Sequence, residues 1–284
     1  MGIPAMLKKL ESLLIHLLLI LGAMVMVMPF AWMISTSLKS QNEVFSYPPV
    51  WIPPNPIWEN YVRAWQAVPF ARYFANSVIV ALAVTLGTLA TSSLAAFAFA
   101  RIRFPGRDAL FAIYLSSMMI PHQMTIIPSF LVLKDFGDFS PALGLDTYFA
   151  LIAPFIASAF GIFLLRQTFL TLPNELEDAA ILDGCGKLGF LWRIVIPLSR
   201  PALATLALFT FMANWNSYLW PLIVTNSNTM RTVQIGLRYF VGQEGNQWGL
   251  LMAAAVFVTL PIVIVYLLVQ KQFVQGIAVT GIKQ

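Results

Sequence analysis

Charged residues are scarce in this sequence. Asp, Glu, Lys and Arg together make up 10% of its 284 residues, whereas about a quarter of the residues in soluble domains are charged. Apolar residues make up 59%, and the mean hydropathy is +0.78. This composition excludes an ordinary soluble domain and predicts a membrane protein. In that setting the net charge of +5 indicates basic cytoplasmic loops and gives no reason to expect nucleic-acid binding.

Cysteine and histidine are almost absent. The single cysteine, Cys185, excludes a disulfide within the chain. The two histidines, His16 and His122, lie far apart in the sequence, so we expect no bound metal. There is no Gly-x-x-x-x-Gly-Lys-Ser/Thr phosphate loop, and the string GCGK at Gly184 is too short to replace one. We therefore expect the chain to bind no cofactor and to catalyse no reaction.

Six long apolar runs fill most of the chain, and none contains Asp, Glu, Lys or Arg. Each is about as long as a helix that crosses the bilayer. A signal peptide is the rival interpretation of the first run, but no A-x-A cleavage pattern follows it. Pro121 and Pro128 should kink or break the third run. We predict an all-α polytopic membrane protein with a transmembrane domain at 13–270 and spans near 13–34, 77–100, 109–133, 147–165, 201–224 and 249–270.

Lysine and arginine predict the orientation. Six spans place both termini on one side, and eleven of the 17 Lys and Arg residues fall in segments on that side. Cytoplasmic loops carry the excess of these residues. We therefore expect the N-terminal segment 1–12, the loop 172–200 and the C-terminal tail 271–284 to be cytoplasmic.

The absence of charge from the apolar runs bears on the energy source. A charged side chain at mid-membrane costs ~2.5–3.5 kcal/mol on insertion scales, so it persists mainly where function needs it. Proton-driven and sodium-driven carriers commonly have such residues. We therefore predict that another protein supplies the energy for transport, and we keep a secondary carrier or a membrane enzyme as a remote alternative.

The loop 172–200 is a long polar segment between two apolar runs. Asn174 and Glu177 have the spacing of a capping box, which predicts the start of a helix. Gly184 should end that helix. A second short helical piece should then run from Lys187 to Ile196 and stop at Pro197.

The same loop resembles the EAA loop of ABC-importer permeases. That pattern is EAA, three residues, Gly, nine residues and Ile-x-Leu-Pro. Ala179, Ala180, Gly184, Ile194 and Pro197 match it in register, whereas Asp178 replaces the usual Glu and Ile196 the usual Leu. The resemblance implies a coupling helix that docks on an ATPase subunit, with the two alanines allowing close backbone approach. The coupling residues expected from it are Glu177, Asp178, Ala179, Ala180, Asp183, Gly184 and Pro197.

A second polar cluster lies in the fifth apolar run. Its residues are neutral hydrogen-bonding and aromatic side chains, which suit the hydroxyls and C–H faces of sugars: Asn214, Trp215, Asn216, Ser217, Tyr218 and Trp220. Contacts between helices are the alternative role for each of them. The surrounding string FTFMANWNSYLWPLIV resembles the fifth span of carbohydrate-importer permeases of the maltose-importer type. MMIPHQMTIIP, FGIFLLRQTFLTLP and QKQFVQGIAVTGIKQ resemble the same family.

The resemblance implies a type I ABC-importer permease fold in a bacterial or archaeal cytoplasmic membrane. It implies as partners a homologous second permease subunit, two ATPase subunits that hold ATP and Mg, and an extracytoplasmic solute-binding protein. The expected solute is a sugar, from monosaccharide to oligosaccharide or a related glycoside, and the alternative is glycerol phosphate or a polyol. In the tail, Gly276, Gly281 and Lys283 are expected to contact the ATPase dimer.

Overall fold

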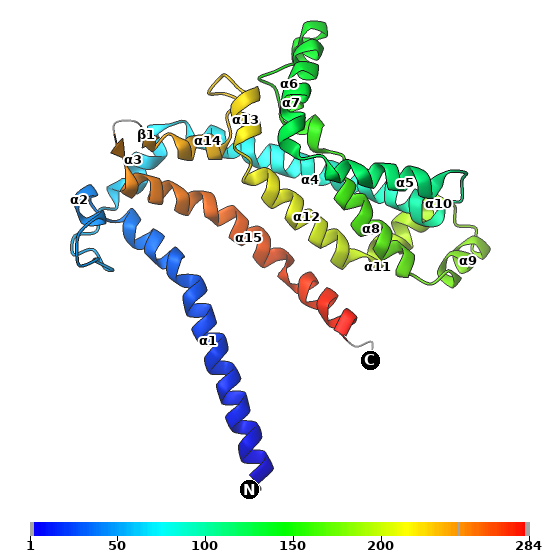
Figure 1. Cartoon of the computed structure of the whole chain (residues 1–284), viewed down its shortest axis with the longest axis horizontal. Helices are drawn as coiled ribbons and strands as arrows, with labels where there is room; N and C mark the ends of the chain where they lie inside the picture. Colours follow the sequence, from blue (N-terminus) through cyan, green and yellow to red (C-terminus); the bar gives the residue numbers. More distant parts are fainter. Residues whose placement is uncertain (1–2, 243–244, 282–284) are drawn as a thin grey trace. The chain divides into compact units, whose positions relative to one another are not determined.

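The computed structural model describes residues 3–242 and 245–281, with side chains for 10–242 and 247–271. Helices dominate it (Figure 1), which confirms the all-α prediction. The first half contains α1 (Ile3–Ser37), α2 (Gln41–Val44), α3 (Glu59–Ala67), α4 (Phe70–Arg101), α5 (Arg107–Ser116), η1 (Ser117–Met119) and α6 (His122–Phe139). Then follow η2 (Pro141–Leu143), α7 (Tyr148–Ile152), η3 (Ala153–Phe155), α8 (Ala159–Thr171), α9 (Glu175–Leu182) and α10 (Lys187–Phe190).

The C-terminal third completes the helical set and contains the described strands. It has the π-helix η4 (Leu191–Val195), α11 (Ile196–Leu198), α12 (Arg200–Trp215), α13 (Leu219–Val224), α14 (Val233–Arg238) and α15 (Trp248–Gly281). Between α14 and α15, β1 (Val241–Gly242) pairs antiparallel with β2 (Gly245–Asn246). The chain divides into two compact units, Met1–Val68 with Leu237–Thr259 and Pro69–Gly236 with Leu260–Gln284.

Four helical segments are long and apolar enough to cross a membrane: Leu10–Ser37, Phe70–Arg101, Pro141–Thr171 and Trp248–Lys271. Two further spans are obtained if each sharply bent helix pair counts as one. Arg107–Met119 and His122–Phe139 meet at 99°, and Lys187–Leu198 and Arg200–Trp215 meet at 81°. Within the described residues the chain thus offers between four and six spans.

The helices extend beyond several of the predicted spans. The helix that contains the second predicted span begins at Phe70, before residue 77, and polar side chains of its first turns find hydrogen-bond partners that hydropathy does not reveal. The helix at the fourth span continues to Thr171, and Arg166 lies inside it. The last helix runs on from the predicted end at 270 to Gly281. With these longer bounds the spans include Arg72 and Arg101, so charge is absent only from their middle parts.

Three of the predicted spans are interrupted. The third breaks at Pro121, as predicted, and α6 then continues through Pro128. The fourth breaks between Phe155 and Ala159, where Pro154 lacks an N–H and Ser158 caps the new helix by accepting a bond from the Gly161 N–H. The fifth breaks between α12 and α13. Pro221 offers no N–H to the carbonyl four residues earlier, which removes one helical bond across that break.

The smaller unit joins α1 to α3 through buried polar contacts. Asn60 of α3 is buried and donates to the carbonyls of Ser37 and Lys39, at 2.9 and 3.1 Å. The ammonium of Lys39 lies 3.9 Å from the centre of the Trp32 ring. Burial lowers the pKa of Lys39, and the nearby Glu43 carboxylate partly opposes that change. The contacts fix the end of α1 against α3.

The larger unit is built around α4, which packs against α8 and α12. Small residues make this possible, because they let helices approach one another closely. A Cβ on Gly161 of α8 would lie 2.5 Å from the Ser92 hydroxyl oxygen, so only glycine fits there. The core at this end of the unit contains Ala96, Phe97, Ala100, Phe111, Ile162, Leu165, Phe169, Ala180, Phe190, Leu191, Val195 and Leu206.

Candidate functional site

The predicted coupling loop lies at one end of the larger unit, and α13 lies at the other (Figure 1). Arg101, at the end of α4, connects the start of the loop 172–200 to the end of α8. Its guanidinium donates to the carbonyls of Phe169 and Leu172, at 2.6 and 2.5 Å, and so satisfies carbonyls at the end of α8. It also donates to Asn174 Oδ1 at 2.7 Å and lies 3.7 Å from Glu177 Oε2. The Arg101 side chain is only 4% exposed.

The predicted capping box at the start of this loop is wrong. Asn174 has helical backbone angles and makes no side-chain cap bond, because its side chain accepts from Arg101. Glu177 is likewise engaged with Arg101 and with Lys187. Acidic residues still fill the first turn of α9, where the helix dipole favours them.

The predicted turn at Gly184 is confirmed. The residue has φ +74°, a conformation that costs other residues roughly 1–2 kcal/mol. The Cys185 N–H donates to the Ala180 carbonyl at 2.8 Å, and the Gly184 N–H donates to Ile181 at 3.0 Å. This pair of bonds is a Schellman motif, the usual glycine-dependent end of a helix. The second helical piece passes Pro197 and ends at Leu198, two residues beyond the predicted last residue Ile196, after the π-turn at 191–195.

The two alanines of the EAA pattern face different ways. Ala179 is exposed, whereas Ala180 is 4% exposed and packs in the core of its own unit. The role of both alanines in close approach of a partner stays a prediction, and Ala180 would contribute to it through its backbone, because its side chain is buried. Asp178 and Asp183 are exposed. The loop also exposes apolar side chains: Ile181 at 54%, Leu182 at 88%, Leu188 at 62% and Trp192 at 54%.

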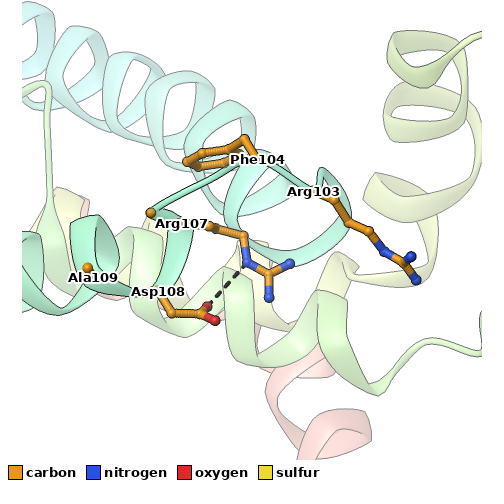
Figure 2. Close-up of a pocket in the computed structure, with 6 residues that line it drawn as sticks. Arg103, Phe104, Arg107, Asp108 and Ala109 are labelled. Carbon is orange, nitrogen blue, oxygen red and sulfur yellow. Dashed lines mark hydrogen bonds and ion pairs between the residues drawn. The ribbon is translucent and has the colours of Figure 1, made fainter.

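A basic pocket of about 390 Å³ lies beside this end, in the turn between α4 and α5 (Figure 2). Arg103 and Arg107 line it, and Asp108 binds the Arg107 guanidinium with Nε and Oδ1 3.2 Å apart. Arg166 Nη2 lies 3.5 Å from the same carboxylate. The charged side chains around this pocket are thus paired with one another. The pocket shares no lining residue with the predicted solute cluster.

The predicted solute cluster adjoins two hollows in the larger unit, of about 360 and 570 Å³. Both are lined by His122, Phe155, Ala213 and Asn214, so they adjoin one another. These residues belong to α6, η3 and α12 and lie at or near the breaks in the third, fourth and fifth spans. Broken helices of this kind line solute sites in many transporters.

The structure brings four of the six predicted pathway residues to the smaller hollow: Asn214, Ser217, Tyr218 and Trp220. Trp220 is also structural, because it is 3% exposed and its indole N–H donates to the Ala150 carbonyl at 3.0 Å. Trp215 is 1% exposed and stacks on Phe211, with ring centres 5.7 Å apart. Asn216 lies outside the hollow lining and accepts from Gln234 at 3.3 Å.

The hollows are also lined by residues that the sequence patterns do not mark as pathway residues. His122 and Gln123 begin α6 and line the smaller hollow with Phe155, although the sequence places them two spans away from Asn214. The helix break at Pro121 was the sequence feature that could have marked His122 and Gln123, because helix breaks expose polar groups that need partners.

Among the residues whose structure is described, no group of three or more His, Cys, Asp or Glu residues could hold a metal ion.

At the other end of the larger unit, a polar network holds the segment after α13. Asn76 is fully buried and donates to the carbonyls of Thr229 and Arg231, both at 2.8 Å. The Tyr148 hydroxyl donates to Asn76 Oδ1 at 2.7 Å. Asp146 accepts from the backbone of the same segment, at Asn226 and Ser227. The network links α4, α7 and the loop beyond α13.

Replacing Asn76 by alanine should lower the stability of the protein by about 2–4 kcal/mol, because each buried polar group left unpaired costs about 1–3 kcal/mol. Thermal unfolding of the detergent-solubilised protein measures the change. Asn216→Ala is the matched control, since that side chain is exposed and its amide oxygen accepts from Gln234 at the longer distance of 3.3 Å. Equal melting temperatures for the two variants would contradict the importance of the network.

Comparison with known proteins agrees with this architecture. Residues 83–279 match a family described as binding-protein-dependent transport system inner membrane component. The chain is 36% identical to the sn-glycerol-3-phosphate transport system permease protein UgpE of Yersinia pestis bv. Antiqua (strain Antiqua), over 92% of this chain and 94% of that protein. It is also 36% identical to UgpE of Rhizobium meliloti (strain 1021), over 96% and 98%.

Solved structures show the same fold. One is a bacterial ABC transporter involved in the import of the acidic polysaccharide alginate, with a TM-score of 0.79 and 26% identity over 94% of this chain and 97% of that one. A second, of a bacterial alginate ABC transporter in complex with an alginate pentasaccharide-bound periplasmic protein, has a TM-score of 0.64 at 14% identity and covers 92% and 94%. The latter likeness shows the fold alone.

Proposed function

Because the chain belongs to the binding-protein-dependent transport system inner membrane component family, we propose that its 172–200 loop is where a partner ATPase drives it. The chain is a multi-pass membrane protein and a permease subunit of an ABC importer. The observation that supports this role is that the loop contains a short helix fixed in position with exposed apolar side chains at its end. A glycine-dependent turn ends α9, Arg101 fixes that helix to α4 and α8, and Ile181 and Leu182 are exposed beside the turn.

The importer contains other subunits besides this chain, and it has a cytoplasmic and an extracytoplasmic side. A second permease subunit, two ATPase subunits and a solute-binding protein are its partners. We propose that this chain is non-catalytic and binds no cofactor, and that ATP and Mg are held by the ATPases. In this arrangement both termini and the loop 172–200 are cytoplasmic, in a bacterial or archaeal cytoplasmic membrane. Gly276 and Gly281 lie in the backbone of α15, and Lys283 lies outside the described residues; their contact with the ATPases stays a prediction.

The solute in this proposal is a sugar or a related polyhydroxylated compound. The smaller hollow supports it, because hydroxyl, amide and aromatic groups from Asn214, Tyr218 and Phe155 line it together. Glycerol phosphate is the second candidate, favoured by the 36% identity to glycerol-3-phosphate permeases.

Uptake by the whole importer tests the proposal. The chain, its second permease subunit, the ATPases and the binding protein are reconstituted in vesicles, and radiolabelled solutes are offered with ATP or a non-hydrolysable analogue. We expect accumulation only with ATP and binding protein. Uptake without any ATPase subunit would overturn the proposal.

A further inference from the structure

The hollows around Asn214 are lined by few ionisable side chains. Among the described residues that line them there is no Asp or Glu, and the ionisable lining groups are His122 and Tyr218. Most other polar lining groups are hydroxyls and amides, including Gln123, Ser129 and Ser217. Such a lining has no carboxylate that would repel an anion, and the His122 imidazole is a nitrogen donor in both hollows.

His122 is placed so that one ring nitrogen is available. Its Nδ1 lies 3.4 Å from the Thr125 hydroxyl one turn along α6. Its Nε2 has no partner among the residues that the structure describes, and the side chain is exposed at the hollow. The imidazole centre is 5.7 Å from the Phe155 ring. The imidazole thus lies beside the Phe155 ring, and its Nε2 is available to hydrogen-bond a solute in the hollow.

The backbone at this point favours the same sign of ligand. His122 is the first residue of the 18-residue helix α6, and the N-terminal end of a helix carries a partial positive charge. This contribution is secondary to the imidazole.

We propose that His122 recognises the anionic group of the transported solute, which is a polyhydroxylated compound carrying a phosphate or a carboxylate. The inference deepens the proposed function and rests on it. Nε2–H donates to the anionic oxygen, while Gln123 and Tyr218 are close enough along the lining to bind hydroxyls. A charge-assisted bond of this kind is about twice as strong as a neutral one.

The test uses the complete reconstituted importer and three substitutions at one position. Initial uptake rates are measured for sn-glycerol 3-phosphate, for a mannuronate trisaccharide and, as a neutral solute, for maltotriose. His122→Asp should lower uptake of the anionic solute by about tenfold or more, because it replaces a hydrogen-bond donor by a carboxylate that repels the anion. His122→Asn should lower it less, and His122→Lys should retain it. Affinity of the wild-type binding protein for the solute is unchanged in all three.

The chain offers a matched control in its other histidine. His16 lies on α1, and its ring contacts Ser12, also on α1, so His16→Asn should leave uptake unchanged. The two anions distinguish a phosphate ester from a carboxylate as the natural ligand.

Two results overturn the inference while leaving the importer function intact. One is that the wild-type importer takes up maltotriose and neither of the two anionic solutes. The other is an equal loss in the Asp, Asn and Lys variants, which indicates a structural role. If the wild-type complex accumulates no solute in response to ATP, the proposed function itself fails.

Discussion

Replacing Gly184 by valine is expected to lower ATP-dependent uptake by about tenfold without preventing insertion of the protein. A side chain in this left-handed conformation costs roughly 1–2 kcal/mol, and about 1.4 kcal/mol corresponds to a factor of ten. A Cβ at Gly184 would meet no atom within 4 Å, so the strain comes from the backbone alone. The Schellman turn should open, and α9 should lose its fixed direction. Uptake and ATP hydrolysis are measured together, and their ratio reports coupling.

Two glycines in the same chain serve as controls for this variant. Gly186 also has open space around it, but its φ is −72°, so Gly186→Val should have little effect. Gly106 has φ +77° and open space, and it lies in the turn between α4 and α5. Gly106→Val should therefore cost similar stability and leave the ratio of uptake to hydrolysis unchanged. Equal coupling in the Gly184 and Gly106 variants would refute a special role for the first turn.

Removing the Arg101 side chain should have the largest effect on the loop. Arg101→Ala leaves the carbonyls of Phe169 and Leu172 without their donor and leaves Glu177 with one cation fewer. We expect a loss of about 3–5 kcal/mol, the range for removing one partner of a buried charge pair. Because α9 also loses its attachment to α4, uptake should fall further than the melting temperature alone explains.

Arg101→Lys separates charge from geometry. Lysine keeps the positive charge but cannot reproduce the planar fork that reaches two carbonyls and Asn174, so the variant should recover only part of the stability. Arg103→Ala is the control, since that guanidinium is exposed two residues away. The melting temperature and the ratio of uptake to hydrolysis are measured for all three proteins. Full recovery by lysine would show that Arg101 acts through charge alone.

The sequence was sufficient for the features that local chemistry determines. The six apolar runs are mostly helical, three of them with breaks, because a backbone in lipid must satisfy its own hydrogen bonds. Gly184 could be predicted as a turn because few other residues adopt its backbone angles. The break at Pro121 followed from the missing N–H of proline.

Features that depend on distant partners could not be predicted in this way. Asn174 fits a capping pattern, yet Arg101, 73 residues earlier in the chain, takes its side-chain oxygen. Ala180 belongs to a motif read as a contact surface, yet it is buried because Phe190 and Leu191 fold back over the same core. In the first turns of α4, Asn76 finds its carbonyl partners some 150 residues away in the sequence.

The solute cluster was predicted in part for the same reason. Asn214, Ser217 and Tyr218 lie close together in sequence and line one hollow. Trp215 is adjacent to them in the sequence but is buried in the core, where it stacks on Phe211. The spacing of residues along the helix did not show which side chains face the hollow and which face the core. His122 and Phe155 join the hollow through two other helix breaks, and no local pattern connects them.

The most direct test of the whole account is a cross-link from the exposed side chain beside the turn. Leu182 is 88% exposed, and Leu182→Cys is introduced together with Cys185→Ser, so that the chain has one cysteine. In the complete importer, a short thiol-directed photo-cross-linker at this position should join the chain to an ATPase subunit. Absence of that product, with labelling of the cysteine by an impermeant maleimide added outside intact cells, would contradict the account.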